Sequence, residues 1–396
     1  MSHNIDQLAK KLAPHYSHFD VSNRLLFTGH SHQAWPDVAR EGLHESFDVA
    51  ASDVDNKWET AFEKVEQLRS YLRNFYDDPD GMYCLGQNTH QLLVSWLSSF
   101  NLQKKPKIIT TDSEFHSMSR QLKRLKEEGL KIVTVDGHSD DIVEQIESQI
   151  DDQVSAVMLS RVYYNSGIIN QHIPKIAEIT RSHNVPLLID DYHGTNVIPL
   201  SISDENLTDC YILIGGYKYL QWGEGNCFLR YPSNCNLRPA ITGWFSSFSK
   251  LDESKEAEKV SYTDPNQLFA SGTFDSTSQF RAAKVVEFFE NMGLTPQVLY
   301  KQYQAQIKLL RNVFLEHNFN SEVIRLAHQQ PVENMGGFLA LQSPFARTIR
   351  AKLMKKGVFT DARGDILRFG VAPYITTQQI SKAMNELKNV VSKINP

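Results

Sequence analysis

Short apolar runs alternate with helical patterns through the middle of the chain. The runs are PKIITTD, KIVTVD, VSAVMLSRV, VPLLIDD and CYILIGG, and they predict strands that are buried on both faces. Between them, MSRQLKRLKEEG, DDIVEQIESQI and IPKIAEITRSHN place apolar residues at helical spacing and predict amphipathic helices. This alternation is typical of an α/β domain with a mostly parallel sheet, and it covers roughly residues 80–230.

Helical patterns also precede the first of these strands. The spacing of apolar residues predicts an amphipathic helix from about Asp53 to Tyr76, and the short apolar run MYCLG follows it. A second helix is predicted to begin at Asn88, Thr89 and His90, with Asn88 or a neighbouring residue as its N-cap.

The pattern changes after Gly272. Two helices are predicted from TSQFRAAKVVEFFENMG and VLYKQYQAQIKLLRNVFLEH, followed by the strand-like pieces GGFLALQ and ILRFGVA and a terminal helix. These elements predict a smaller α+β unit at the end of the chain. A charged segment with weak apolar periodicity, residues 249–264, is predicted to be exposed.

Composition limits the possible functions. The 396 residues include 41 lysines and arginines against 46 aspartates and glutamates, which gives a formal net charge of −5. This mild acidity argues against a nucleic-acid-binding protein, whose binding face is usually basic. The N-terminus shows no apolar signal region and no run of about 18 apolar residues occurs, so we expect neither secretion nor a membrane span. The four cysteines form no C-x-x-C pair, which favours a reducing cytoplasm.

Two segments carry the candidate chemistry, LLIDDYHGT and GGYKYLQWGEG. Asp190 and Asp191 end one predicted strand and Lys218 follows another, so we expect an acid and an amine at the edge of the sheet where ligands bind. A lysine there can hold an aldehyde cofactor as a Schiff base, and an acid can bond a protonated pyridine nitrogen. The helix start at Thr89 offers N–H groups and a hydroxyl to a phosphate. A lysine, a carboxylate and a phosphate-binding helix start are together the groups that bind pyridoxal phosphate.

Each part alone has a more ordinary explanation. A lysine after a strand is usually a solvated charge, an Asp-Asp pair is usually a turn or a cap, and a polar helix start is usually capping. The prediction of a cofactor site therefore depends on the order of the three parts along one α/β unit.

Elsewhere, His30 and His32 form an H-x-H pair, which is expected to be a polar pocket wall because no third metal ligand converges on it.

From LLFTGHSHQAWP to ILRFGVAPY, the chain resembles the fold-type I pyridoxal-phosphate enzymes of the class V aminotransferase group, and within that group it is most similar to the kynureninases. The G-Y-K-Y run resembles the lysine segment, which implies that Lys218 binds the aldehyde of pyridoxal 5'-phosphate and that Tyr217 contacts its phosphate. IDDYHG matches the family's D-x-x-H, which implies Asp190 at the pyridine nitrogen and His193 at the polar edge of the ring. Asp191 is the alternative acid if the register slips by one.

Further segments imply further cofactor contacts. SEFHS resembles the segment whose aromatic residue stacks on the cofactor ring, here Phe115. NTH resembles the phosphate-binding turn, here Asn88 and Thr89. TGWFSS and SGTFDS resemble segments that reach the phosphate across a dimer interface, which implies roles for Trp244 and Thr273.

Other features bear on the substrate. ILRFGVAPY resembles the segment whose arginine, here Arg368, binds the substrate α-carboxylate through a bidentate ion pair.

The chain also departs from kynureninase-like sequences. Met118 stands where an aspartate is usual, Trp222 and Glu224 interrupt the glycines after the lysine, and GHSHQA replaces a G-N-S-L-G-like segment. We expect these departures to change the pocket more than the cofactor contacts.

The resemblance implies a two-domain homodimer with its active site at the interface. The large cofactor domain is expected at residues 50–275, and the small domain at residues 276–396 with residues 1–49. In a kynureninase-like reaction, Lys218 removes the Cα proton and hydrolytic Cβ–Cγ cleavage releases alanine and an aromatic acid. His116 and His193 are both candidates for handling protons.

Several other functions fit parts of the pattern. A transaminase or a β-eliminating lyase would use the same cofactor and the same lysine. A cysteine desulfurase is disfavoured because it needs a nucleophilic cysteine on a late loop, and the last cysteine, Cys235, lies in the predicted cofactor domain. A catalytically silent α/β binding protein would not need the lysine, acid and arginine together. No G-x-G-x-x-G or G-x-x-x-x-G-K-[ST] motif indicates a nucleotide-binding enzyme.

Overall fold

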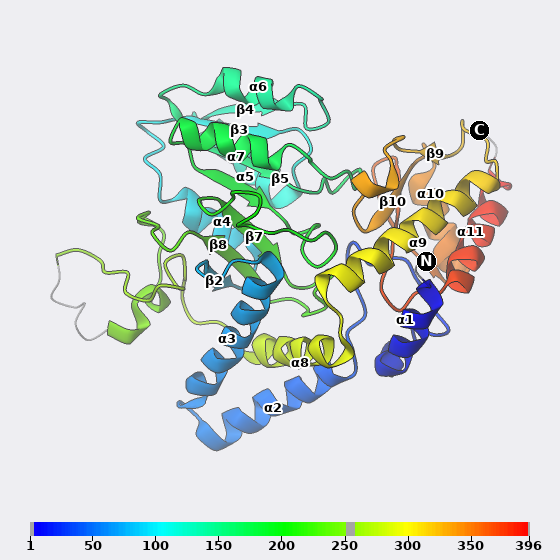
Figure 1. Cartoon of the computed structure of the whole chain (residues 1–396), viewed down its shortest axis with the longest axis horizontal. Coiled ribbons are helices and arrows are strands. Elements are labelled where there is room, and N and C mark those ends of the chain that lie inside the picture. Colours follow the sequence, from blue (N-terminus) through cyan, green and yellow to red (C-terminus); the bar gives the residue numbers. More distant parts are fainter. Residues whose placement is uncertain (1–3, 251–257, 395–396) are drawn as a thin grey trace.

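The computed structural model describes residues 4–250 and 258–394 and forms two lobes (Figure 1). The larger lobe is built around a seven-stranded sheet and the smaller lobe around a four-stranded sheet. Residues 251–257, which belong to the segment predicted to be exposed, lie outside the described residues. No helix in the described part of the chain is long and apolar enough to cross a membrane.

The central sheet has the strand order β2-β8-β7-β6-β5-β3-β4. Its strands are β2 (Met82–Gly86), β3 (Lys107–Thr111), β4 (Lys131–Val135), β5 (Val154–Ser160), β6 (Leu187–Asp190), β7 (Tyr211–Gly215) and β8 (Cys227–Tyr231). Every neighbouring pair is parallel except those made by β8, which runs antiparallel to β2 and to β7. The predicted α/β fold with a mostly parallel sheet is therefore confirmed.

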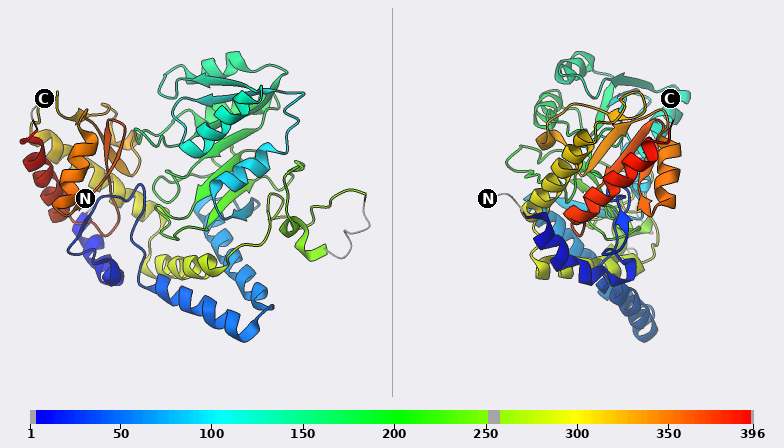
Figure 2. Two further views of the ribbon diagram at one scale, coloured as in Figure 1. Left: turned by 180° about the vertical axis from the view of Figure 1, so that it is seen from behind. Right: turned by 90° about the vertical axis from the view of Figure 1, so that its right-hand side faces the viewer.

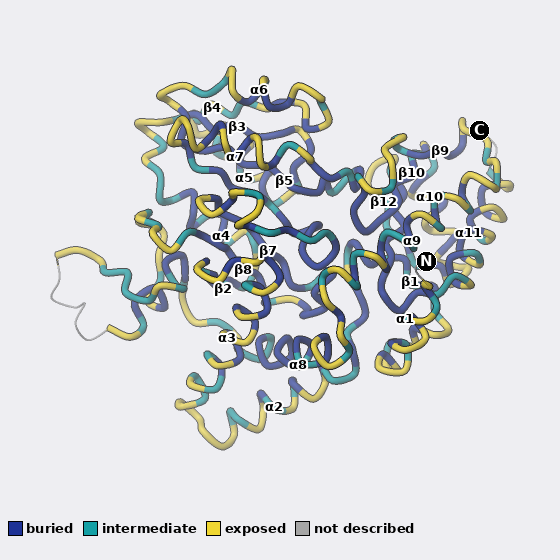
Figure 3. The backbone as a smooth tube through the Cα atoms, in the orientation of Figure 1, coloured by how far each residue is buried: buried dark blue, intermediate teal, exposed yellow. Residues whose placement is uncertain are grey.

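Helices cover both faces of this sheet (Figure 2). They are α4 (Thr89–Leu97) and α5 (His116–Glu127) on one face, and α6 (Ile142–Gln149) and α7 (Ile173–Ser182) on the other. Successive side chains of a strand point to opposite faces, so Leu188 packs in the core with α4 and α5 whereas Ile189 packs in the core with α6 and α7. The inner strands are buried along their length (Figure 3), which explains their near-continuous apolar sequence.

Three further helices pack together beside the central sheet: α2 (Val38–Asp53), α3 (Lys57–Tyr76) and α8 (Thr277–Met292). The helix predicted up to Tyr76 is α3. A break at Val54, whose φ is +50°, separates it from α2, which the apolar spacing did not predict.

The smaller lobe is an antiparallel sheet, in the order β12-β13-β10-β9, covered by helices. Its elements are α9 (Pro296–Glu316), β9 (Arg325–Leu326), β10 (Phe338–Gln342), α10 (Ala346–Lys355), β12 (Asp361–Arg363), β13 (Ile366–Gly370) and α11 (Thr377–Val391). The predicted C-terminal α+β unit is confirmed.

The N-terminal segment lies beside this smaller lobe. Helix α1 (Ile5–Leu12) packs on α9, and β1 (Leu25–Leu26) pairs in parallel with β11 (Val358–Phe359). The segment then crosses β13, where the backbone N–H of Gly370 donates to the carbonyl of Phe27. The exact domain boundaries, after residues 49 and 275, stay a prediction.

Candidate active site

A cavity of about 340 Å3 lies at the carboxyl ends of β5, β6 and β7. This is the edge at which ligands bind in open α/β sheets, and the volume suits a small cofactor with its substrate. Seven residues singled out from the sequence line it: Asn88, Thr89, Phe115, Asp190, His193, Tyr217 and Lys218. The structure therefore brings together side chains that lie up to 130 positions apart (88 to 218) in the sequence.

Lys218 is buried in this cavity. Its Nζ lies 2.6 Å from Nε2 of His193, and it lies 5.4 Å from the ring centre of Phe115 and 4.5 Å from that of Tyr192. Burial lowers the pKa of Lys218 to about 7, although the nearby carboxylate of Asp190 acts in the opposite direction. A substantial fraction of this amine is therefore neutral near pH 7, which is the form that attacks an aldehyde.

Two adjacent aspartates at the end of β6 point to opposite sides. Asp190 lines the cavity, and its Oδ1 accepts a hydrogen bond of 2.9 Å from the backbone N–H of Tyr192. Asp191 instead accepts two bonds from the guanidinium of Arg161, at 2.6 and 3.1 Å, and one of 2.8 Å from the hydroxyl of Tyr76. Only Asp190 can therefore face a ligand in this cavity. Burial raises the pKa of Asp190.

The first turn of α4 forms the other end of the cavity. Asn88 is the N-cap, as predicted, and its side chain accepts a 2.9 Å bond from the backbone N–H of Gln91. N–H groups at the start of a helix and the helix dipole favour a bound anion. Thr89 and Tyr217 also line the cavity.

Tyr192 is a cavity residue that the sequence analysis did not single out. Its ring lies close to the backbone at Gly215, because a Cβ on Gly215 would come within 1.7 Å of it. The glycine that ends β7 thus makes room for the ring beside Lys218. The signal was present in the sequence, since Tyr192 lies inside the IDDYHG segment.

Glu114 is a second buried carboxyl group that was not predicted from the sequence. It accepts bonds from the hydroxyl of Thr111 at 2.6 Å and from the N–H and hydroxyl of Ser160 at 3.1 and 2.5 Å. Burial raises the pKa of Glu114 to about 7. These bonds fix the loop that carries Phe115 to β5, so Glu114 orients the predicted stacking ring.

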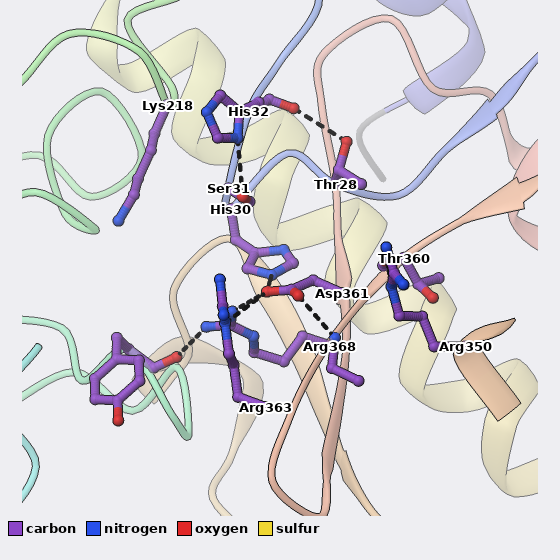
Figure 4. Close-up of polar contacts among 12 residues, drawn as sticks. Thr28, His30, Ser31, His32, Lys218, Arg350, Thr360, Asp361, Arg363 and Arg368 are labelled. Carbon is purple, nitrogen blue, oxygen red and sulfur yellow. Dashed lines mark hydrogen bonds and ion pairs between the residues drawn. The ribbon is translucent and has the colours of Figure 1, made fainter. Parts of the chain in front are cut away.

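Arg368 approaches the cavity from β13 of the smaller lobe (Figure 4). Its Nη1 donates a 2.6 Å hydrogen bond to the backbone carbonyl of Tyr164, a residue that lines the cavity. Its Nη2 pairs with Asp361, which lies opposite it on β12. The sequence predicted the arginine but not this carboxylate partner, because the pairing of two antiparallel strands brings them together.

Three other predicted residues do not line this cavity. Trp244 is 42% exposed and packs on Phe245 and Phe248, and Thr273 lines a separate hollow beside Trp58. Their predicted contact with a phosphate across a dimer interface stays a prediction. His116 begins α5 and lines the neighbouring surface groove.

The departures from the kynureninase-like pattern fall in different places. Met118 and Trp222 are fully buried in the hydrophobic core, so the expectation that they change the pocket was wrong. Glu224 does line the cavity, and its carboxylate lies 3.5 Å from Nε2 of His32. The His32 ring stacks on Tyr217 with ring centres 4.8 Å apart. Two departures therefore meet at the cavity rim.

The family described as aminotransferase class-V matches residues 36–330, and the kynureninase C-terminal domain matches residues 304–387. The chain belongs to the class V aminotransferase family. The resemblance found in the sequence is confirmed, and the cofactor is pyridoxal 5'-phosphate. The residues present fit this group: Lys218 is buried and partly neutral, Asp190 faces the cavity, and Nδ1 of His193 is buried with no hydrogen-bond partner among the described residues.

The chain is similar to relatives that are described as having different activities. An uncharacterised aminotransferase, YcbU, of Bacillus subtilis is 22% identical over 93% of this chain and 98% of its own length. The kynureninase of Bacillus cereus is 22% identical over 77% and 72%, and the cysteine desulfurase IscS of Rickettsia massiliae is 26% identical over 85% and 82%. A solved structure of a C-DES mutant with glycine covalently linked to its PLP cofactor has a TM-score of 0.79 at 15% identity, over 95% of this chain and 98% of that one.

Removing the Lys218 amine is expected to change how the stability of the apoprotein depends on pH. The folded-state pKa, about 7, is below the value of about 10.5 for an exposed lysine, so between these values the unfolded chain binds more protons and the wild type gains stability as pH rises. The gain approaches about 1.4 kcal/mol per pH unit at most. Denaturant unfolding of apoprotein at pH 7, 8 and 9 should show this slope in the wild type but not in Lys218→Met. Parallel curves would contradict it.

Proposed function

We propose that this class V enzyme hydrolyses the Cβ–Cγ bond of kynurenine or a related amino acid. The observation that carries the proposal is the buried Lys218 amine, 2.6 Å from His193 in a cavity with aromatic walls. Beside the predicted cofactor-stacking residue Phe115, Tyr164 and Tyr192 supply rings against which an aryl side chain can pack. The match to the kynureninase C-terminal domain, which includes Arg368, supports the same substrate class.

Each residue has a separate task in this proposal. Bound pyridoxal phosphate supplies the electron sink for the bond that breaks. Lys218 takes the proton from the substrate Cα, and Asp190 holds a proton on the pyridine nitrogen. His193 stays neutral, because burial lowers its pKa well below the usual value, and its Nε2 orients the Lys218 amine. Arg368 binds the substrate carboxylate.

An aminotransferase is the second candidate. The Bacillus subtilis relative that covers 93% of this chain is described as an aminotransferase, and the same lysine, acid and arginine would serve it. A cysteine desulfurase fits less well, although such enzymes are among the relatives. Burial raises the thiol pKa of each of the four cysteines, all of which are free, so none is a ready thiolate nucleophile.

Product analysis separates these activities. The holoenzyme would be incubated with kynurenine or 3-hydroxykynurenine, with and without a keto-acid acceptor. The proposal predicts alanine and an aromatic acid in equal amounts, formed without the acceptor. Products that form only with the acceptor, together with amino transfer to it, would instead establish the aminotransferase.

Replacing Arg368 with alanine should raise KM for the amino-acid substrate by about 10- to 100-fold, with a smaller change in kcat. The reason is that a charge-assisted hydrogen bond to the carboxylate is lost in both the bound ground state and the transition state. Steady-state kinetics on the product assay measure the effect. An unchanged KM would remove Arg368 from the carboxylate site.

A homodimer in the cytoplasm completes the proposal. Trp244, in the segment predicted to reach the partner subunit, and Ile241 just before that segment expose apolar side chains, and apolar surface of this kind favours association. Four free cysteines suit a reducing compartment. Sedimentation of the purified protein tests the dimer.

A further inference from the structure

The cavity offers little positive charge to a cofactor phosphate. Lys218 is the only lysine or arginine that lines it among the described residues, and this amine is the one expected at the cofactor aldehyde. Asp190 and Glu224, which also line the cavity, are acids. A phosphate ester carries up to about two negative charges near pH 7. Within this subunit it is therefore held mainly by neutral N–H and O–H groups, so every hydroxyl near the start of α4 matters.

Tyr192 places one such hydroxyl at this end of the cavity. Its Cζ, the ring carbon that carries the hydroxyl, is the atom that a Cβ on Gly215 would meet first, at 1.7 Å. The phenol therefore lies across the backbone at the end of β7, where Cys227 of β8 is the strand partner of Gly215. The hydroxyl oxygen of Tyr192 lies 3.8 Å from Sγ of Cys227, and both residues line the cavity.

The thiol of Cys227 connects this hydroxyl with the first turn of α4. Burial raises the pKa of Cys227 to about 11, against the opposing effects of the Tyr192 hydroxyl and of the Thr89 backbone. The thiol is therefore in contact with the phenol and with the backbone at Thr89, the residue that begins α4. The Tyr192 hydroxyl thus lies close to the helix start that is expected to bind the phosphate.

The Tyr192 hydroxyl is able to donate a hydrogen bond to such a group. A thiol sulfur is a weak acceptor, so a charged phosphate oxygen is the stronger partner for this hydroxyl. Burial raises the pKa of Tyr192 well above its usual value, so the hydroxyl keeps its proton. The ring of Tyr217, the other tyrosine at this end, lies beside it with ring centres 5.0 Å apart. Two phenols therefore lie together near the start of α4.

We propose that Tyr192 is a cofactor-binding residue whose hydroxyl donates a hydrogen bond to the phosphate of pyridoxal 5'-phosphate. Gly215 makes this possible, because a Cβ at that position would displace the phenol from the end of β7. The resemblance to the family implied phosphate contacts for Asn88, Thr89 and Tyr217 and gave Tyr192 no role. The inference concerns the cofactor alone and does not depend on which reaction follows.

Cofactor binding to the apoprotein tests this hydroxyl without measuring turnover. Pyridoxal 5'-phosphate and pyridoxal differ in the phosphate group alone, and each would be titrated while its visible absorbance band is followed. The wild type should prefer the phosphate form. Tyr192→Phe, which removes one oxygen atom, should lose about 10- to 100-fold of that preference, the range expected for one hydrogen bond to a charged group. Its affinity for pyridoxal should change little.

A matched tyrosine provides the control for this substitution. Tyr211 also places its hydroxyl beside a thiol, 3.4 Å from Sγ of Cys235, but it does not line the cavity. Tyr211→Phe should therefore keep the wild-type preference. If Tyr192→Phe does not fold, Tyr192→Leu takes its place, with the same expected loss of preference.

Three results would overturn the inference. The first is an unchanged preference in a folded Tyr192→Phe or Tyr192→Leu protein. The second is an equal loss of affinity for both ligands, which would show that the substitution disturbs ring packing rather than a phosphate contact. The third is a wild type that binds pyridoxal as tightly as pyridoxal 5'-phosphate. Because no amino-acid substrate is present in these titrations, failure of the proposed hydrolysis would not change their outcome.

Discussion

The Lys218→Ala protein is expected to lose the visible absorbance band of bound pyridoxal phosphate and at least about 1000-fold of its turnover. In the proposed function, Lys218 joins the cofactor aldehyde and also takes the Cα proton, so one substitution would remove both a covalent link and a general base. Absorbance scans of the dialysed protein and product assays measure the two effects separately.

A surface lysine provides the control for this substitution. Lys355→Ala removes an exposed amine near the end of α10 and should leave both the band and the turnover unchanged. A Lys218→Ala protein with a wild-type band after dialysis would contradict the assignment of this residue. Loss of turnover with the band intact would keep Lys218 as a base but not as the cofactor lysine.

Substitutions of the two adjacent aspartates should separate catalysis from stability. Asp190→Asn is expected to lower kcat by about 100- to 1000-fold while the unfolding temperature stays close to that of the wild type, because it removes a charge that acts on the cofactor. Asp191→Asn is expected to lower stability by about 3–5 kcal/mol, because it leaves the buried guanidinium of Arg161 without its counter-ion.

The comparison needs both measurements on both proteins. Thermal unfolding of the apoproteins reports on the ion pair, and kinetics of the reconstituted enzymes report on the reaction. The reverse result, a stable but inactive Asp191→Asn and an active Asp190→Asn, would show that the acid register is shifted by one residue.

Much of the large lobe could be predicted from the sequence because its signals are local. The apolar runs at β3, β5, β6 and β7 mark strands buried on both faces, and the carboxyl ends of parallel strands meet at one edge. This is why Asp190 and Lys218, 28 positions apart, could be placed in one site. The N-cap at Asn88 was predictable for the same reason, since capping depends on neighbouring residues.

Features that depend on distant contacts could not be predicted in this way. Sequence order does not say which of Asp190 and Asp191 faces the cavity, because the answer depends on Arg161 and Tyr76 behind the sheet. The Asp361–Arg368 pair requires the register of β12 against β13. The burial of Met118 likewise depends on how α5 packs on the sheet. The resemblance to kynureninase-like sequences carries no information about this packing, and it placed Met118 in the pocket instead.

The most direct test of the account is chemical trapping of the cofactor. The holoenzyme would be reduced with borohydride, digested and analysed by mass spectrometry, which reports the lysine that carries a stable pyridoxyl phosphate group. The account predicts one labelled peptide, the one that contains Lys218 within GGYKYLQWGEG. A label on a different lysine, or an unlabelled Lys218 peptide from a protein that shows the cofactor band, would contradict it.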